Sequence, residues 1–344
     1  MKDIKSLTME ELKCEMIDMG EKAFRAKQLY DWMHVKLARN YDEMKNIPKS
    51  LVAKLQERFT YTCLEAVDVQ TSKIDGTRKF LFSLGDGNYV ESVWMQYHHG
   101  NSVCISSQVG CRMGCRFCAS TLDGLERSLR PSEMLDQIYA ITRITGERVS
   151  NIVVMGTGEP LDNYDNLLTF IHMLTDENGL HISQRNLTVS TCGIVPNMRR
   201  LADEKLQITL ALSLHGSNQE KRAKLMPIAN RYHIDEVIDA CAYYFEQTGR
   251  RITFEYSLVG GVNDTDEDAA ELATLIGRLN CHINLIPVNP IKERDYIQSE
   301  KQQIQKFQNK LERNKINCTI RREMGRDIDG ACGQLRRRHM QDES

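Results

Sequence analysis

The feature that most constrains the fold of this chain is a regular alternation of strand-like and helix-like segments after residue 101. One of the helix-like segments carries a clear apolar stripe, formed by Ile234, Val237 and Cys241 at helical spacing. The expected strands are 102–107, 151–155, 187–191, 208–214, 252–258 and 282–288, and the expected helices are 132–145, 163–175, 196–204, 234–248, 267–279 and 299–314. Six β–α units predict an α/β fold with a parallel sheet and right-handed crossovers.

Six units are too few to close an eight-unit barrel, so we expect a partial, open (β/α)6 barrel, with a last strand at 317–321. In such barrels the chemistry collects at the carboxyl ends of the strands. The residues at these ends that we expect to converge on one mouth are Gly158, Glu159, Ser190, Ser213, Leu214, His215 and Asn289. Glu159 can accept hydrogen bonds from an ammonium group, and the serine and asparagine side chains can hold a carboxylate or a ribose.

Two smaller segments precede the barrel, which we place at 101–344. Residues 1–75 show helical spacing and a capping box at Thr8 and Glu11, and they predict a small helical unit that either grips a substrate or only packs. Residues 76–100 predict a β-hairpin, with strands 78–84 and 88–97 on either side of a Gly-Asp-Gly turn.

Glu91 is the one charged residue on an otherwise apolar face of the second hairpin strand, which it shares with Val93 and Met95. A carboxylate in this position should be partly desolvated, which raises its pKa and suits proton transfer. A structural salt bridge, or a face turned to solvent, is the alternative interpretation.

Composition sets limits on what the chain can do. A net charge of −2, from 45 basic and 47 acidic residues, gives no global signal for nucleic acid, although Arg321, Arg322 and Arg326 form a local basic cluster. No run of about 18 apolar residues predicts a membrane span, and the charged stretch 1–18 is no secretory signal. Eleven cysteines in an intracellular-looking chain then indicate thiol or metal chemistry rather than disulfides.

Three of the cysteines, Cys111, Cys115 and Cys118, lie at gaps of four and three residues in one glycine-containing loop. Thiolates are soft ligands that suit zinc or iron–sulfur clusters. A structural zinc site normally closes four ligands, whereas a four-iron cluster held by three thiolates leaves one iron open to a substrate. The odd number of cysteines favours the cluster, and a zinc knuckle that recruits Cys104 as its fourth ligand is the alternative.

A further cysteine stands near the end of the chain. Cys332 lies between Gly330 and Gly333 and close to basic residues, a context that fits a reactive nucleophile better than a buried core thiol. Cys104, seven residues before Cys111, is expected near the barrel mouth by the same geometry.

The C-x3-C-x2-C spacing resembles the radical S-adenosylmethionine (SAM) superfamily, in which SAM binds the open iron and is cleaved to a 5′-deoxyadenosyl radical. Longer runs resemble the RlmN/Cfr family of radical-SAM adenosine methyltransferases, and Gly158-Glu159-Pro160-Leu161-Asp162-Asn163 is similar to its RlmN branch. The other matching runs are Cys104-Ile-Ser-Ser-Gln-Val-Gly-Cys111, Gly114-Cys115-Arg-Phe-Cys118-Ala119, Ser213-Leu214-His215, Leu225-Met226-Pro227-Ile228, Gly261-Val262-Asn263-Asp264 and Ala331-Cys332-Gly333-Gln334-Leu335.

The resemblance implies one [4Fe–4S] cluster on Cys111, Cys115 and Cys118, and two SAM molecules per turnover, held by the strand-end residues named above. Cys332 would take a methyl group from one SAM, and a radical from the second SAM would abstract hydrogen from that S-methyl group. The carbon radical would add to the adenine ring. Cys104 would then attack the sulfur of Cys332, releasing the product and leaving a transient Cys104–Cys332 disulfide, with Glu91 as proton acceptor.

The resemblance also implies the substrates and partners. They are an adenosine of 23S rRNA near the peptidyl-transferase centre and the tRNA adenosine just 3′ of the anticodon, both methylated at C2, which a radical can attack and a polar mechanism cannot. An N-terminal accessory RNA-binding domain, a reductant such as flavodoxin or ferredoxin, and a cytoplasmic monomer without a membrane partner are expected. The alternatives are Cfr-type methylation at C8 and a zinc-bound RNA-binding protein without catalysis.

Overall fold

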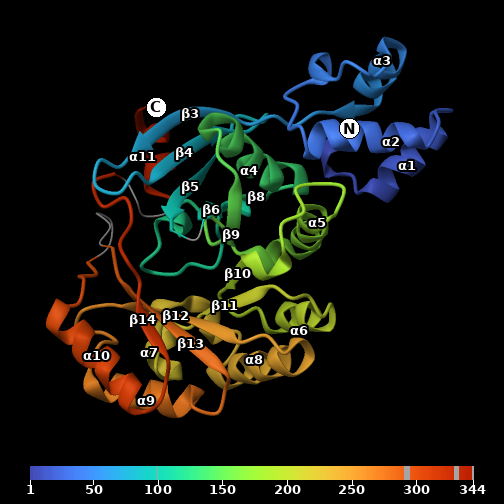
Figure 1. Ribbon diagram of the computed structural model, residues 1–344. Helices are drawn as coiled ribbons and strands as arrows, with labels where there is room; N and C mark the ends of the chain where they lie inside the picture. Colours follow the sequence, from blue (N-terminus) through green and yellow to red (C-terminus); the bar gives the residue numbers. More distant parts are fainter. Residues whose placement is uncertain (99, 290–294, 329–332, 343–344) are drawn as a thin grey trace.

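The structure is a computed structural model that describes residues 1–98, 100–289, 295–328 and 333–342 (Figure 1). Its centre is a ten-stranded sheet with the order β14-β13-β12-β11-β10-β9-β6-β5-β4-β3. The strands are β3 (Glu65–Thr71), β4 (Arg78–Ser83), β5 (Tyr89–Tyr97), β6 (Gly100–Ile105), β9 (Val149–Val154), β10 (Leu187–Thr191), β11 (Thr209–Ser213), β12 (Ile252–Leu258), β13 (Cys281–Pro287) and β14 (Cys318–Ile320). Neighbours from β6 to β14 are parallel, and those from β3 to β6 are antiparallel.

The helices between the parallel strands confirm the predicted alternation, with ends that differ by only a few residues. They are α4 (Pro131–Thr145), α5 (Tyr164–Thr175), α6 (Val195–Asp203), α7 (Gln219–Leu225), α8 (Ile234–Thr248), α9 (Asp266–Ile276) and α10 (Lys301–Arg313). Pro131 begins α4, where its missing N–H costs nothing, and Gly146 ends it at a φ of 69°. The sheet order ends at β14 and β3, so the barrel is open, as predicted. Among the described residues, no helix has the length and apolar character that a bilayer crossing requires.

The N-terminal segment projects from one end of the sheet (Figure 1) and contains α1 (Met9–Asp18), α2 (Phe24–His34) and α3 (Lys49–Arg58). The predicted capping box is present: the Glu11 N–H donates to Thr8 Oγ1, and the Thr8 N–H donates to Glu11 Oε2. Short strands complete the structure, namely β1 (Lys2–Asp3), β2 (Phe59–Thr60), β7 (Gln108–Gly110) and β8 (Leu125–Ser128).

One part of the predicted helical unit is a strand. Residues 65–71 form β3, which pairs with β4 at the edge of the large sheet. Val67 and Val69 alternate with half-buried residues, and this period of two favours an edge strand over a helix. The predicted hairpin of β4 and β5 is confirmed, and it extends the barrel sheet because β5 also pairs with β6.

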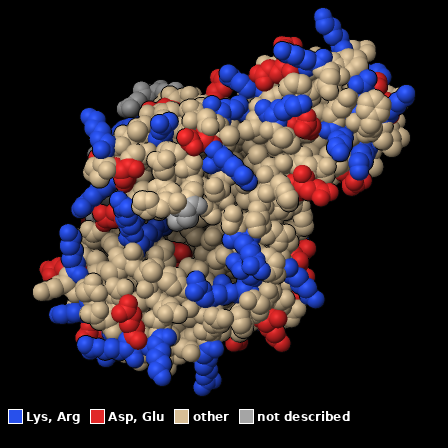
Figure 2. Space-filling view, viewed as in Figure 1, with Lys and Arg blue, Asp and Glu red and all other residues tan. Residues whose placement is uncertain are grey.

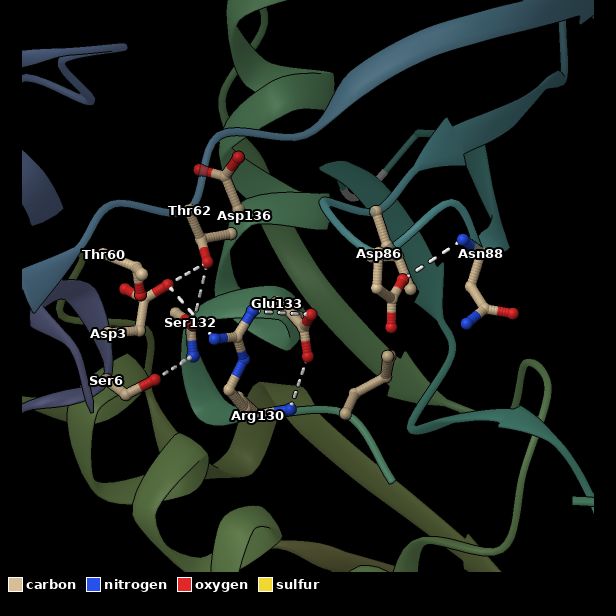
Figure 3. Close-up of polar contacts among 12 residues, drawn as sticks. Asp3, Ser6, Thr60, Thr62, Asp86, Asn88, Arg130, Ser132, Glu133 and Asp136 are labelled. Atoms are coloured by element: carbon tan, nitrogen blue, oxygen red, sulfur yellow. Dashed lines mark hydrogen bonds and ion pairs between the residues drawn. The ribbon is translucent and has the colours of Figure 1, made fainter. Parts of the chain in front are cut away.

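A buried polar cluster joins the N-terminal segment to α4. Lys5 and Asp136 form an ion pair whose side chains are both fully buried, and Lys5 Nζ also donates to the Thr62 carbonyl at 2.9 Å. Figure 3 shows how the Thr62 hydroxyl lies between Asp3 and Ser132: it donates to the Asp3 carboxylate and accepts from the Ser132 hydroxyl at 3.4 Å. Each charge in this junction therefore has a partner within the chain.

Candidate active site

A cavity of about 450 Å³ lies at the carboxyl ends of β12 and β13. Three residues that the sequence predicted as functional line it: Cys104 on β6, Cys118 in the cysteine loop and Asn289 after β13. Gln334, the first residue of α11 (Gln334–Asp342), lines the same cavity. Segments that are far apart in the sequence thus line one half-open cavity.

The strand β5 supplies another wall. Val93, Met95 and Tyr97 line the cavity at alternate positions, and Glu91 precedes them on the same face of the strand. Glu91 has an exposed fraction of 3%, so the predicted burial of this carboxylate is confirmed. Lys79 on β4 is also fully buried, and its Nζ lies 3.0 Å from Glu91 Oε2.

Glu91 also anchors the C-terminal helix. The Gly333 N–H donates to Glu91 Oε2 at 2.6 Å, and the Arg336 N–H donates to Glu91 Oε1 at 2.6 Å. These are N–H groups at the start of α11, which a carboxylate caps favourably. Cys332 lies outside the described residues, but the chain that follows it is held by this carboxylate.

Gly333 is packed directly against the end of the cysteine loop. Its φ of 85° belongs to the left-handed region, and a Cβ at this position would lie 2.9 Å from the Ser120 backbone nitrogen. Ser120 belongs to the single 3₁₀ turn Ala119–Thr121, which begins immediately after Cys118. The C-terminal segment therefore docks beside the cysteine loop.

The cysteine loop has a buried inner face. Burial, followed by the nearby Glu159 carboxylate and Cys118, raises the pKa of the Cys111 thiol to about 12. Burial and the proximity of Cys118 and Cys111 raise the pKa of Cys115 well above its usual range. The loop rests on α7 through a hydrogen bond of 2.9 Å from the Arg116 N–H to the Leu225 carbonyl.

These thiols fit a [4Fe–4S] cluster. Metal coordination removes a thiol proton, so it relieves the cost of burying three thiolates together. Beside Cys115 lies Arg222, a buried guanidinium whose Nε and Nη1 have no partner among the described residues, which suits an anionic group.

Glu159 is at the end of β9, as predicted, and its exposed fraction is 4%. Its Oε1 accepts from the Leu161 N–H at 3.0 Å, and its Oε2 accepts from the Cys192 N–H at 2.8 Å, which ties β9 to β10. Burial raises the pKa of Glu159 despite these bonds. Gly158 has a φ of 110°, and a Cβ there would lie 2.6 Å from Gln108 Cβ, so only glycine fits.

The structure brings together the next two strand ends. The hydroxyl oxygens of Ser190 on β10 and Ser213 on β11 are 3.4 Å apart, and both side chains are half-buried. Two adjacent hydroxyls can share one carboxylate or ribose group. Leu214, which follows, is fully buried, and its backbone N–H donates to the Glu255 carbonyl of β12 at 3.0 Å.

His215 connects β11 to the cysteine loop. Its ring lies edge-on to Phe117, with 4.8 Å between the ring centroids and 72° between the planes. Its Nδ1 accepts from the Ser257 N–H at 2.9 Å. Burial, and then the charge of Arg222, lowers the pKa of His215 to about 3, so the imidazole is neutral near pH 7.

The sequence did not indicate two buried cations of this site. Lys79 pairs with Val93 in the hairpin and therefore lies on the same sheet face as Glu91. The register of the hairpin could have predicted this pair. Arg222 lies in a charged run on a helix, α7, that was not predicted. The cluster of Arg321, Arg322 and Arg326 was noted in the sequence, and the structure places it on the cavity wall. Figure 2 shows further Lys and Arg side chains around a hollow on one face of the molecule.

An open parallel sheet with three thiols in one loop at its mouth defines a radical SAM protein, and the model of the radical SAM superfamily matches residues 105–276. The model of the ribosomal RNA large subunit methyltransferase N-terminal domain matches residues 2–60. The chain is 68% identical to a probable dual-specificity RNA methyltransferase RlmN of Lachnospira eligens, over 99% of this chain and 98% of that protein. The chain belongs to the RlmN family.

Other similarities agree with this assignment. A protein of the same name from Lachnoclostridium phytofermentans is 64% identical over 97% of this chain and 94% of its own. The crystal structure of a radical SAM methyltransferase from Sphaerobacter thermophilus matches with a TM-score of 0.93 and 41% identity, covering 97% of this chain and 99% of that one. The predicted family, partial barrel, enzyme class and cofactors, a [4Fe–4S] cluster and SAM, are confirmed. The Cfr-type alternative and the non-catalytic zinc protein are not favoured.

Proposed function

We propose that this protein methylates C2 of an adenosine in two classes of RNA. The substrates are the 23S rRNA adenosine near the peptidyl-transferase centre and the tRNA adenosine just 3′ of the anticodon. The similarity to RlmN proteins over nearly the whole chain supports this proposal. The observation that carries it is the single cavity lined by Cys104, Cys118 and Gln334, because it joins a resolving thiol, a cluster ligand and the segment next to Cys332.

The cofactor residues are assigned by their place at the mouth. When bound, the cluster and SAM supply the transferred methyl group and the 5′-deoxyadenosyl radical. Cys111, Cys115 and Cys118 hold the cluster. The residues that hold SAM are Gly158, Glu159, Ser190, Ser213, Leu214, His215 and Asn289. The paired hydroxyls of Ser190 and Ser213 and the cavity position of Asn289 support this set.

Cys332 carries the methyl group, and Cys104 releases the product by attacking the sulfur of Cys332. Cys104 lines the cavity and is 6% exposed, so its thiol is shielded from bulk solvent. Glu91 accepts the proton that leaves the adenine ring. Its two oxygens accept hydrogen bonds from the N–H groups of Gly333 and Arg336, at the start of α11, which follows Cys332 in the sequence.

RNA binding is assigned to two places. Residues 1–75 form an accessory RNA-binding domain, residues 76–100 extend the barrel sheet, and residues 101–344 form the catalytic domain. Arg321, Arg322 and Arg326 on the cavity wall contact phosphates, which fix the RNA without reading its sequence. The adenosine is splayed out of its stack to enter the cavity, as enzymes that modify a base in folded RNA require.

We also propose that the protein acts as a monomer in the cytoplasm and receives electrons from flavodoxin or ferredoxin. Arg112 lies in the cysteine loop and forms an ion pair with Asp162, and its side chain is nevertheless 63% exposed. An exposed surface this close to the cluster ligands suits a brief encounter with a small electron carrier.

The direct test is methylation of separated RNAs by the anaerobically purified protein. Unmodified 23S rRNA and unmodified tRNA are incubated with SAM and a reductant, digested to nucleosides, and compared with standards by chromatography and mass spectrometry. The expected product is 2-methyladenosine from both RNAs, and none from the Cys115→Ala variant. Formation of 8-methyladenosine, or no methylated adenosine from either RNA, would overturn the proposal.

A further inference from the structure

Arg222 is an exceptional buried charge in this molecule. Its side chain is 0% exposed, and Nη2 donates to the Cys192 carbonyl at 2.6 Å. Its Nε and Nη1 atoms have no hydrogen-bond partner within the described part of the chain. Lys5 and Lys79 are equally buried, but each lies against a carboxylate. A buried guanidinium with unmet donors is destabilising, so its retention calls for an explanation beyond packing.

Two glycines leave room for the Arg222 side chain and backbone. A Cβ on Gly216 would lie 2.5 Å from the Arg222 backbone nitrogen, and one on Gly193 would lie 3.2 Å from Nη2. Burial lowers the pKa of the Arg222 guanidinium, and the groups that oppose this effect are the side chains of Cys192, Cys115 and Cys241. No carboxylate is among these groups within the described residues.

Arg222 lies on α7, next to the cysteine loop. It precedes Leu225 by three residues, and the Leu225 carbonyl accepts the hydrogen bond from the Arg116 N–H of that loop. Cys111, Cys115, Cys192 and Leu225 belong to one apolar cluster. Arg222 is fully buried and Cys115 is half-buried, so the electrostatic interaction between them is screened less than a pair at the surface would be.

A four-iron cluster held by three thiolates carries a net negative charge, which grows when the cluster accepts an electron. A fixed positive charge in a dry interior therefore stabilises the reduced cluster more than the oxidised one, and nearby charge is one of the factors that set cluster potentials. The sulfurs of the cluster and its thiolates are also acceptors for N–H donors. Both properties match a guanidinium with two unused nitrogens.

We propose that Arg222 is the internal counter-charge of the iron–sulfur centre: it holds the three-thiolate loop in its anionic, cluster-bound form and raises the reduction potential of the cluster. This inference rests on the proposed function, since it needs the cluster. Arg222 is proposed as a positioning residue, because it acts through the cluster. A guanidinium that binds the SAM carboxylate, or one that only braces α7, would behave differently.

The test measures the reduction potential of the cluster in the anaerobic holoprotein without SAM, by a titration followed by electron paramagnetic resonance. Arg222→Gln and Arg222→Met are compared with Arg222→Lys, which keeps the charge, and with Arg116→Gln, which removes an exposed charge from the same loop. We expect the Gln and Met variants to shift to more negative potentials and to lose iron faster during anaerobic dialysis. Arg222→Lys should lie closer to the wild type, and Arg116→Gln should match it.

A second measurement covers the iron-free chain. Without the cluster the unmet charge only destabilises, so iron-free Arg222→Met should melt at or above the temperature of the iron-free wild type. An unchanged potential with full iron content would refute the inference, as would a loss confined to SAM affinity or an iron-free Arg222→Met protein that unfolds. A wild-type protein that holds no cluster would instead refute the proposed function.

Discussion

The molecule buries a cation in each of two regions, and the two cations have different partners. One region is the junction between the N-terminal segment and α4, and the other is the part of α7 next to the cysteine loop. At the junction, Lys5 binds Asp136 and the Thr62 carbonyl, and the Leu64 N–H donates to the second oxygen of Asp136. Next to the cysteine loop, Arg222 donates one hydrogen bond to the Cys192 carbonyl, and its Nε and Nη1 have no partner among the described residues.

Under the proposed function, the difference separates polar groups that stabilise the fold from those that bind a cofactor. A junction that is complete within the chain needs nothing else to be stable. A site that must hold a cofactor keeps its donors and its buried thiols unmatched until the cofactor arrives, and the folded chain without it bears the cost. Changes at the junction should therefore cost stability, and changes at the cysteine loop should cost chemistry.

The largest effect is expected at the loop. Cys115→Ala removes a proposed cluster ligand, so iron content should fall and RNA methylation should cease, whereas the melting temperature of the iron-free chain should change little. Iron analysis, a methylation assay and thermal scanning measure these three quantities. Cys14→Ala, which changes an exposed cysteine, is the control and should behave as the wild type. A Cys115→Ala protein with full activity would contradict the claim that changes at the cysteine loop cost chemistry.

At the junction, Lys5→Met leaves the Asp136 carboxylate buried without its ammonium partner. Because Arg143 still lies 3.3 Å from Asp136, we expect a loss of about 3 kcal/mol in the free energy of unfolding, near the lower end for broken buried pairs. Urea denaturation measures this loss. Lys13→Met, which breaks an exposed pair with Glu10, should cost less than about 0.5 kcal/mol. Equal losses in the two variants would contradict a structural role for the junction.

His34, on α2 next to the junction, should also make stability depend on pH. Burial, and then the charge of Lys5, lowers the pKa of His34 from 6.5 to about 3. Below pH 6.5 the unfolded chain takes up a proton that the folded chain cannot, so stability falls as the pH drops through the window from 6.5 towards 3. Between pH 6.5 and 5 the expected loss is about 1.6 kcal/mol. Urea denaturation of wild type and His34→Phe tests this, because the variant should lack that part of the slope.

Glu91 combines the two kinds of region, since it is fully partnered yet lies beside the cavity. Glu91→Gln weakens the hydrogen bonds that cap α11 and the ion pair with Lys79. The free energy of local opening of α11 should fall by about 1.4 kcal/mol. The backbone amides of α11 should then exchange hydrogen about tenfold faster, as mass spectrometry can follow. Glu126→Gln, on the exposed part of β8, is the control. Unchanged exchange in α11 would mean that Glu91 does not anchor this helix.

Periodicity predicted the elements that bury one face, which is why the strands and helices of the barrel could be found from the sequence. The burial of Glu91 followed from the same rule, because strand alternation placed it among Val93 and Met95. Partners across the structure could not be predicted in this way. The pair of Lys79 with Glu91 depends on hairpin register, and the place of Arg222 depends on α7, a short helix whose charged sequence resembles a solvated loop.

The most direct test of the account uses Cys104→Ala with an RNA substrate under turnover conditions. If the cavity is the reaction chamber, the methyl-carrying Cys332 couples to the RNA but cannot be released. The account predicts a covalent RNA–protein adduct that peptide mapping assigns to Cys332, and little free methylated RNA. Normal multiple turnover by Cys104→Ala, without an adduct, would contradict it.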